Sequence, residues 1–562
     1  MYNKTEEEKD MTVIEKLLEE IAPQEIADRR MRSIVELLLN LIEELKREVK
    51  EVREENQKLR DENNRLKGEQ GKPEIKAKKL AAKYESEKER QIPKEHKKSS
   101  KNAKIKIDRE EIIKYPKENL PADAEFKGYQ EVVVQDIILR TDNVLYRREK
   151  YYSATEGKTY IAEMPKGHEG QFGANVKALI LSLYYSGNMT EGKILRFLED
   201  IGTLMSAGYL SNLLIKDKEQ FAAEKNAVQI AGLGSSPWQH FDQTGARVKG
   251  ENYTTNVLCN PLYTSYITTK KKDRLAVLQA LQNGQELEFL LNAFTYELLE
   301  GFQVAAKWQN ILKTFAQEQV FTSAEFEQLL DEHLGKLGKQ QRSRVLEAAA
   351  IAFYRQQTSI PVIQTLISDD APQFKAITEN LALCWVHEGR HYKKLNPVVA
   401  CHRVLLEQFL DDFWDYYREL LAYKDAPSSE LATLLIVKFA LLFDTTSGYE
   451  QLDDRKRLSA AKSSELLWVL LHPELPLHNN SAELAVRTMV QRRNISYATQ
   501  TAQGTNAWDI FMSLVDTTRK LGISFFAYIR DRISSLELIP PLDSIIQNLS
   551  SLYSFGSSWI PS

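Results

Sequence analysis

Three acidic segments, far apart in the sequence, contain the carboxylates best suited to chemistry. They are His240-Phe241-Asp242-Gln243-Thr244-Gly245, Ser368-Asp369-Asp370-Ala371-Pro372-Gln373-Phe374 and Asn479-Asn480-Ser481-Ala482-Glu483. Mg2+ prefers oxygen ligands such as carboxylates. Two such ions, about 3.5–4 Å apart, stabilise the attacking and leaving oxygens of an in-line phosphoryl displacement. If Asp242, Asp369 and Glu483 converge, the sequence predicts a site for two Mg2+ or Mn2+ ions that acts on nucleic acid.

Each carboxylate lies in a different predicted element. Asp242 follows a strand pattern that begins near Pro237, and its two neighbours in the chain point to the opposite face. The apolar segment 359–367 predicts a short strand ending on Asp369, and 381–387 predicts another strand. Glu483 is expected on a helix. An isolated Asp in a strand is more often a turn or cap residue, so the prediction depends on all three segments together.

These elements predict a multidomain α+β protein whose catalytic part, residues 236–530, is an RNase H-like α/β domain. Helical insertions are expected at about 286–357 and 396–470, where helical periodicity interrupts the strands. Residues 531–562 are expected to form a C-terminal tail. Trp308 and Trp414 lie in the insertions, where they can stack on a flipped base or belong to the scaffold.

The N-terminal region, residues 1–70, carries a heptad repeat that predicts a coiled coil. Its a and d positions alternate through Val35, Leu38, Ile42, Leu45, Val49, Val52, Asn56, Leu59, Asn63 and Leu66. β-Branched residues at a and Leu at d favour a parallel two-stranded coil, so we expect a homodimer. The alternative is a single amphipathic helix packed on its own domain.

Three further regions are expected before the catalytic domain. Within a linker at 71–126, residues 72–106 contain thirteen Lys or Arg and five Glu, which gives this basic arm a local net charge of +8. The arm can bind the phosphate backbone of DNA, or it can be a solvated linker. Alternation from Lys127 predicts three or four antiparallel strands in a small β module, 127–168. Short helices at 169–235, divided at Gly187-Asn188 and at Gly202 or Gly208, predict a helix-turn-helix-like DNA-binding module or a plain helical unit.

The composition excludes several classes of protein. The three cysteines are far apart and form no CxxC pair, which excludes a disulfide framework and a structural zinc site. No apolar run reaches the roughly 18 residues of a membrane span, and the acidic N-terminus lacks the apolar core of a signal peptide. We therefore expect a cytoplasmic protein with no membrane partner.

The motifs around the carboxylates resemble bacterial DDE transposases of the insertion-sequence sixty-six family. Residues 242–248 resemble D-E-T-G-x-R-V, with Gln243 where the family usually has Glu. Residues 368–374 resemble both S-D-N-G-P-E-F of retroviral-type integrases and D-G-Y-x-x-Y of the family, and both alignments select Asp369. Residues 384–392 resemble C-W-A-H-x-R-R-x-F, and 479–487 resemble N-N-x-A-E-R-A-I-R. The resemblance extends from about residue 127 to 530.

This resemblance implies a transposase that cleaves and transfers DNA strands at the ends of an insertion element. Its partners would be double-stranded DNA, both the terminal inverted repeats and the target, and accessory proteins of the element. The family usually has a cysteine-rich zinc ribbon after the coiled coil. The corresponding region here has no Cys, so we expect no zinc.

Further site residues are expected around the motifs. Basic residues positioned to contact DNA are Arg247, Lys249, His387, Arg390, Arg487, Arg492 and Arg493. For any single Arg, a surface salt bridge is the alternative, and His387 can instead be a proton-transfer group or a buried structural residue. We expect Asp370 to cap the following helix rather than to act as an outer metal ligand, and Cys384 to belong to the core.

Two other functions compete with this interpretation. One is a catalytically inactive, transposase-derived DNA-binding dimer that acts as a repressor or architectural protein. The other is a Holliday-junction resolvase. The intact Asp/Asp/Glu set argues against the first, and the chain length and N-terminal coil argue against the second.

Overall fold

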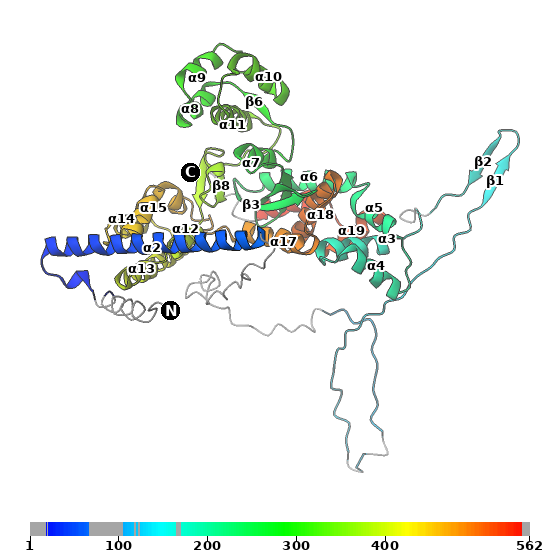
Figure 1. The fold of residues 1–562 in the computed structure, drawn as a ribbon. Coiled ribbons are helices and arrows are strands. Elements are labelled where there is room, and N and C mark those ends of the chain that lie inside the picture. The colour runs from blue at the N-terminus through cyan, green and yellow to red at the C-terminus, as the bar shows by residue number, and fades with distance from the viewer. Residues whose placement is uncertain are drawn as a thin grey trace.

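The mixed α+β character expected from the sequence is confirmed. The structure, a computed structural model, describes residues 18, 21–66, 105–116, 120–121, 124–164 and 170–552. A five-stranded sheet with strand order β5-β4-β3-β8-β9 lies in the middle of the molecule, and helices surround it (Figure 1). Most of the basic linker lies outside the described residues. No helix in the described part of the chain has both the length and the apolar character that a membrane span requires.

The sheet combines an antiparallel meander with two parallel strands. β3 (Trp238–Val248), β4 (Glu251–Cys259) and β5 (Thr264–Thr269) are antiparallel neighbours, while β8 (Thr365–Ser368) and β9 (Asn380–Leu383) run parallel to β3. The turn between β3 and β4 consists of Lys249 and Gly250, both with positive φ, 49° and 81°. Such a two-residue turn matches the twist of paired strands, so β3 continues directly into a long hairpin.

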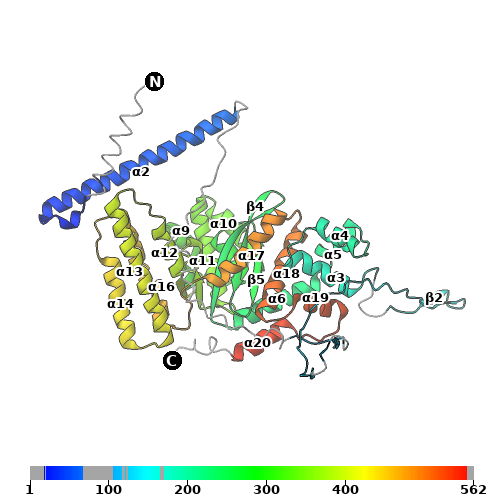
Figure 2. The ribbon, with the colours of Figure 1, turned by 90° about the horizontal axis from the view of Figure 1, so that it is seen from below.

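Helices cover both faces of the sheet (Figure 2). The Tyr266 hydroxyl on β5 lies 2.9 Å from the carbonyl oxygen of Ala485 in α17 (Asn480–Ser496). The hydroxyl of Ser265, which points the other way, donates to Gln229 of α6 (Glu219–Gly234) at 2.6 Å. Because successive side chains of a strand point to opposite faces, α17 and α6 lie on opposite sides of β5.

The free edge of β5 is covered by α18 (Ala502–Lys520) in a regular pattern. The backbone N–H groups of alternate strand residues donate to side chains spaced by four along the helix: Thr264 to Thr517, Tyr266 to Ser513 and Thr268 to Asp509. A bare sheet edge is a template for pairing with another chain. The buried polar side chains of α18 therefore accept hydrogen bonds from the backbone N–H groups at this edge of the sheet.

Both predicted insertions are largely helical. α7 (Arg274–Leu281) precedes the first insertion, which contains α8 (Ala293–Gly301), α9 (Ala306–Leu312), α10 (Ser323–Leu334) and α11 (Lys339–Gln356). It also holds a small hairpin sheet that the sequence did not predict, formed by β6 (Glu288–Leu290) and β7 (Val320–Thr322).

The second insertion contains α13 (Ala400–Asp425), α14 (Ser429–Asp444), α15 (Glu450–Ala460), α16 (Ser463–Leu466) and η6 (Trp468–Leu470). Its core is rich in aromatic residues. Trp414 is 4% exposed there, and its ring packs edge-on against that of Phe413. Of the two roles considered for Trp414, the scaffold role is the one that its burial supports.

The helical module consists of α3 (Ala174–Leu181), the π-turn η4 (Ser182–Ser186), α4 (Glu191–Asp200), α5 (Ala207–Ile215) and α6. The predicted breaks at Gly187 and Gly202 are confirmed, whereas Gly208 lies inside α5. The C-terminal region is not a tail as far as it is described. α19 (Phe525–Ser534) and α20 (Leu542–Leu552) pack onto the module, and Arg532 pairs with Glu224 of α6 at 2.9 Å.

The predicted β module is wrong in extent. Among residues 124–164 the structure has only one hairpin, β1 (Lys150–Ser153) with β2 (Lys158–Ile161), which projects away from the body (Figure 1). The alternating apolar residues before it find nothing to pack against: Val134, Ile137 and Ile138 are each at least 80% exposed. Strands that bury no apolar face are not independently stable, so the alternation alone does not produce them.

The heptad segment forms one long helix, α2 (Arg29–Leu66), preceded by the short turn η1 (Pro23–Glu25). Its first half packs on the second insertion (Figures 1 and 2). The carboxylate of Glu43, 3% exposed, accepts the backbone N–H groups of Val398 and Val399 at 2.6 and 2.9 Å, and lies 3.3 Å from His402 Nδ1. The first half of the helix thus packs on its own chain, as expected for the alternative of a single amphipathic helix. Several side chains at d positions of the heptad repeat stay exposed.

Candidate active site

Asp242 and Asp369 are placed next to each other by the strand register. β3 and β8 run parallel with Trp238 opposite Thr365 and His240 opposite Ile367. Continuing this register by two residues brings Asp369, the first residue after β8, opposite Asp242. Paired strands lie about 4.8 Å apart, so the register brings the two carboxylates close to each other.

Glu483 reaches the same site from the first turn of α17, and Asn479 fixes the start of that helix. Asn479 Oδ1 accepts from His240 Nδ1 at 2.9 Å, and Asn479 Nδ2 donates to the carbonyl of Phe241 at 2.8 Å. Its own carbonyl oxygen accepts the Glu483 N–H at 3.0 Å. Burial lowers the pKa of His240 to about 3, so its ring is neutral and donates from Nδ1. Glu483 is therefore positioned relative to the strand that carries Asp242.

The Glu483 carboxylate is held by two residues of α12 (Trp385–Lys393). Arg390 donates from Nη1 and Nη2 to its two oxygens at 3.3 and 3.1 Å. Arg390 Nη1 also lies 3.1 Å from His387 Nε2, and His387 Nδ1 lies 3.7 Å from Glu483 Oε1. A carboxylate has about four acceptor positions, so this pairing leaves Glu483 able to bind a cation as well.

The placement of His387 corrects the sequence prediction, which had put it on a strand. β9 ends at Leu383, and Cys384 is the N-cap of α12. The segment leaves the sheet because Trp385 is drawn into the core of the second insertion, where its Nε1 donates to the carbonyl of Leu466 at 2.9 Å. Burial lowers the pKa of His387, against the opposing effect of Glu483, so the ring is neutral at pH 7.

The surroundings of Asp242 oppose the ionisation of its carboxyl group. Burial, together with the negative charges of Asp369 and Glu483, raises the pKa of Asp242 to about 6. The Asp242 carboxylate accepts one hydrogen bond, from the Gln243 N–H at 2.7 Å, and no ion pair to it occurs among the described residues. Carboxylate oxygens are ligands that Mg2+ and Mn2+ prefer, but the carboxylate oxygens of Asp242, Asp369 and Glu483 do not all lie within 4.8 Å of one another in this structure.

A second donor set shares Glu483. Cys384, His387 and Glu483 each offer a ligand atom, and these atoms lie within 4.8 Å of one another. Cys384 is buried, as predicted, and its Sγ accepts the Asn479 N–H at 3.2 Å. Burial raises the pKa of Cys384 to about 12. Among the described residues this is the group of three that meets this spacing, and neither Asp242 nor Asp369 belongs to it.

Asp370 does not cap a helix, contrary to expectation. The helix-like turn η5 (Pro372–Phe374) has Ala371 at its N-cap, and Asp369 Oδ1 accepts the Ala371 N–H at 3.2 Å. Asp370 instead pairs with Lys375 at 3.1 Å and with Lys462 of the second insertion. These two ammonium groups lower its pKa although burial opposes them. The pairs tie the Asp369 turn to the insertion.

The residues predicted to contact DNA fall into three groups. Arg247, Lys249 and Arg487 have exposed side chains, and Arg493 is partly exposed with one hydrogen bond, to the Thr244 hydroxyl at 3.4 Å. Arg390 and His387 face Glu483. The remaining residue, Arg492, is the wrong prediction.

Arg492 is 0% exposed and faces away from solvent. Its guanidinium lies 3.8 Å from the centre of the Tyr184 ring, and Nη1 donates to the Tyr184 carbonyl at 2.7 Å. A DNA phosphate cannot reach it, so its role is to join α17 to the helical module.

Sequence reasoning missed the positioning roles of Asn479 and Lys462. The sequence contained a signal for Asn479, because this residue begins the Asn-Asn segment before Glu483. The sequence contained no signal for the role of Lys462, because its partner Asp370 lies 92 residues earlier in a different element.

Comparison with known proteins gives one informative relative. No model of a known protein family matches the chain. An uncharacterized protein of Sinorhizobium fredii, y4jO, is 31% identical to it over 317 residues, which are 56% of this chain and 98% of that protein.

Proposed function

Since this chain belongs to the same protein family as the uncharacterized y4jO of Sinorhizobium fredii, a name that assigns no activity, we propose its function from the site itself. The protein is a DDE transposase that cleaves DNA at the ends of an insertion element and joins them to a target. The observation that carries this proposal is the convergence of Asp242, Asp369 and Glu483 at β3, β8 and α17.

The strand order supports the finer description of the catalytic domain as RNase H-like. Three antiparallel strands followed by two parallel ones place Asp242 on the central strand and Asp369 at the end of its neighbour. The resemblance of the motifs to the insertion-sequence sixty-six family points to the same fold. In this proposal α4 and α5 form the helix-turn-helix-like unit that contacts the terminal repeat.

Asp242, Asp369 and Glu483 would hold two Mg2+ or Mn2+ ions. When bound, these ions supply charge stabilisation for the attacking and leaving oxygens of an in-line displacement. Arg390 holds the Glu483 carboxylate towards the site, and Asn479 fixes its helix. Arg247, Lys249, Arg487 and Arg493 are placed to contact the DNA backbone, which orients the scissile phosphate.

The exposed heptad positions support a homodimer. Leu38, Leu45, Val52 and Leu59 are each at least 51% exposed on α2, and such a row fits a second copy of the same helix. Sedimentation of Val52→Lys tests this expectation: the variant should be monomeric, whereas the exposed-charge control Lys50→Glu should remain dimeric. A monomeric wild-type protein would contradict it.

A strand-transfer assay tests the enzymatic proposal. The full chain is mixed with target DNA and with duplexes taken from both flanks of its coding region, with and without Mg2+. We expect Mg2+-dependent joining that falls at least about a thousandfold in Asp242→Asn, Asp369→Asn and Glu483→Gln. Asp411→Asn, an exposed acidic residue on α13, is the matched control.

Two outcomes would contradict the proposal. If Asp242→Asn joins ends as well as the wild type does, the site is misassigned. If the wild type binds the flanking DNA specifically and joins nothing, the inactive DNA-binding dimer becomes the better description.

A further inference from the structure

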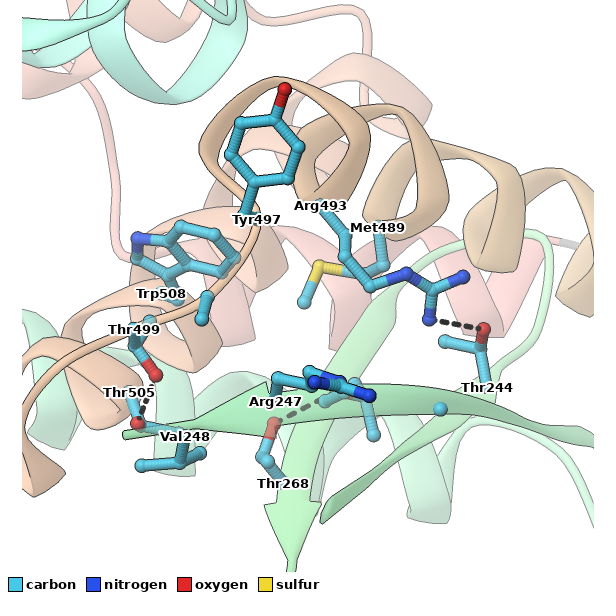
Figure 3. A pocket seen from close by; sticks show the side chains of 14 residues that line it. Thr244, Arg247, Val248, Thr268, Met489, Arg493, Tyr497, Thr499, Thr505 and Trp508 are labelled. Carbon is cyan, nitrogen blue, oxygen red and sulfur yellow. Dashed lines mark hydrogen bonds between the residues drawn. The ribbon is translucent and has the colours of Figure 1, made fainter. Parts of the chain in front are cut away.

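The helix that carries Glu483 is fixed at both ends to the strand that carries Asp242. Its first turn is held to β3 through Asn479. Near its other end the Arg493 guanidinium donates to the Thr244 hydroxyl at 3.4 Å (Figure 3), and two backbone hydrogen bonds join the loop after α17 to the end of β3. The spacing between β3 and α17 is therefore set by contacts between these two elements themselves.

The other neighbours of Glu483 come from α12. This helix carries His387 and Arg390, which contact the Glu483 carboxylate. It is packed closely on the second insertion, since a Cβ atom on Gly389 would lie 2.7 Å from Cζ2 of Trp414, too near for any side chain. We therefore treat α12 and the second insertion as one packed unit.

Glu388, in the first turn of α12, joins this helix to α15. Its buried carboxylate receives Arg455 and the hydroxyl of Ser459, both at Oε1, and Lys462 Nζ lies 3.7 Å from Oε2. A buried charge is costly unless it is paired and hydrogen-bonded, and these partners meet that requirement. Glu388 is thus a fixed point of α12, next in the chain to His387.

Lys462 connects this fixed point to the turn that carries Asp369. Its ammonium group pairs with Asp370 Oδ2 as well as with Glu388 Oε2, and its side chain is 12% exposed. Asp370 directly follows Asp369 in the chain. One largely buried cation therefore lies between two carboxylates, and each of these is the neighbour of a residue of the candidate site.

The separation between the Asp369 turn and α12 matters for a bound cation. Mg2+ demands near-ideal octahedral geometry, with oxygens at about 2.0–2.1 Å, so a small change in the position of one ligand changes its affinity. Without the ammonium group of Lys462, the carboxylates of Asp370 and Glu388 would face each other as like charges and repel. The two sides of the site would then move apart.

We propose that Lys462 is a positioning residue of the carboxylate site: by pairing with Asp370 and Glu388 at once, it sets the separation between Asp369 and the α12 side chains that hold Glu483. Lys462 acts only through its two partners. This inference rests on the proposed function and adds to it the way in which the second insertion shapes the site.

Binding of Mn2+ to the full-length protein, measured by electron paramagnetic resonance, tests this role without any reaction. The ions at the candidate site are those whose binding is lost in Asp242→Asn. Partners that hold metal ligands in place typically cost about 10–100-fold in metal affinity when they are replaced, so we expect Lys462→Met to weaken Mn2+ binding at least about tenfold. Lys462→Arg, which keeps the charge, should recover most of this loss. The matched control is Arg457→Met, on α15, where the side chain is 68% exposed.

The sign of this effect separates positioning from simple electrostatics. If Lys462 acted on the site through its charge alone, removing a nearby cation would tighten Mn2+ binding. The proposal predicts the opposite sign.

Asp370→Asn gives a second variant, from the other end of the bridge and at a partly exposed residue. It should weaken Mn2+ binding by a similar factor. The double variant Lys462→Met/Asp370→Asn should bind Mn2+ about as weakly as either single variant, because residues of one network are not additive. Affinity near the wild-type value in the double variant would instead indicate that the two charges act independently and cancel.

DNA joining supplies the second readout. In Lys462→Met, the Mg2+ concentration for half-maximal joining should rise about tenfold, whereas the rate at saturating Mg2+ should approach that of the wild type and DNA affinity should not change. A variant that is merely damaged in its fold would lose rate at every Mg2+ concentration, and that result would contradict the positioning role.

Unchanged or tighter Mn2+ binding in Lys462→Met would overturn this role, as would equal weakening in Arg457→Met. Failure of the proposed function is a separate result. A wild type that binds Mn2+ through Asp242 but joins no DNA rejects the transposase, and the Mn2+ measurements still decide the role of Lys462. Mg2+-dependent joining by the wild type, with Mn2+ binding unaffected in Lys462→Met, rejects only the role of Lys462.

Discussion

The side chain of Asn479 is hydrogen-bonded to His240, with 2.9 Å between Asn479 Oδ1 and His240 Nδ1, and this contact joins α17 to β3. Asn479 is 0% exposed, and its Nδ2 donates a hydrogen bond to the Phe241 carbonyl. The residue has no group that could act on a substrate directly from this position. It is a positioning residue, whose effect on chemistry passes through Glu483.

Replacing Asn479 should therefore reduce catalysis more than binding. In Asn479→Ala, the buried His240 N–H and Phe241 carbonyl lose their partners and the first turn of α17 can shift. A misplacement of about 1 Å can cost about a hundredfold in rate, so we expect strand transfer to fall about 10- to 100-fold with DNA affinity unchanged. Asn480→Ala is the matched control. Equal activity in both variants would reject this role.

The response to Mg2+ should depend on pH through Asp242. Because the pKa of Asp242 is raised to about 6, the folded protein binds its proton more tightly than the unfolded chain does. Without metal, ionisation of Asp242 thus makes the fold less stable as pH rises from about 4 through 6.

Mg2+ stabilises the ionised form, so its effect on the melting temperature should be small at pH 5 and larger at pH 7.5. Scanning fluorimetry at the two pH values measures this difference. Asp242→Asn should remove most of it. A Mg2+ shift of the same size at both pH values would be inconsistent with the electrostatics of this site.

Glu43 should control the docking of α2. Its carboxylate is the acceptor for two backbone N–H groups of the second insertion, and leaving such buried donors unpaired costs about 1–3 kcal/mol each. In Glu43→Ala, amide hydrogen exchange across residues 29–46 should become faster, as mass spectrometry can measure. Glu44 is the exposed neighbour of Glu43 in the chain, and Glu44→Ala is the control variant. Identical exchange in the two variants would show that this contact does not hold the helix.

The same docking should weaken in acid. His402 and the N–H groups of Val398 and Val399 lower the pKa of Glu43, although burial opposes them. A carboxylate with a lowered pKa stabilises the fold above its ordinary pKa of 4.5, and this stabilisation disappears as pH falls through the lowered value. Exchange of α2 should thus increase only at strongly acidic pH.

Arg487 and Arg492, five residues apart on one helix, should behave in opposite ways. Arg487→Ala should leave the melting temperature unchanged, weaken DNA binding and reduce the slope of log affinity against log salt by about 1. Arg492→Ala should lower the melting temperature by about 4 °C or more, because the cation and its packing on Tyr184 are buried. A reduced salt slope in Arg492→Ala at normal stability would contradict its burial.

Local sequence patterns predicted the elements that carry the acidic residues. The strand around Asp242 and the short apolar strand before Asp369 are recognisable from their own residues. Their adjacency required the parallel pairing of β3 and β8, which a single sequence does not encode locally.

The errors have a common physical cause in long-range contacts. The segment 384–387 has strand-like composition but becomes a helix because Trp385 packs in the second insertion, where its hydrogen-bond partner Leu466 lies 81 residues away. Arg492 looks like a surface cation, yet its partner Tyr184 lies 308 residues earlier. In both cases the deciding partner belongs to another part of the fold, so no local window could contain it.

The contact between Glu43 and His402 joins residues separated by 359 positions in the chain. During synthesis at about 5–20 residues per second, α2 emerges about 20–70 s before the insertion on which it docks. Throughout that interval its whole apolar surface faces solvent, and a neighbouring nascent chain on the same messenger RNA offers an identical helix. In the proposed homodimer, pairing between nascent chains would therefore precede docking, and each molecule would acquire its partner before the rest of its own chain is complete.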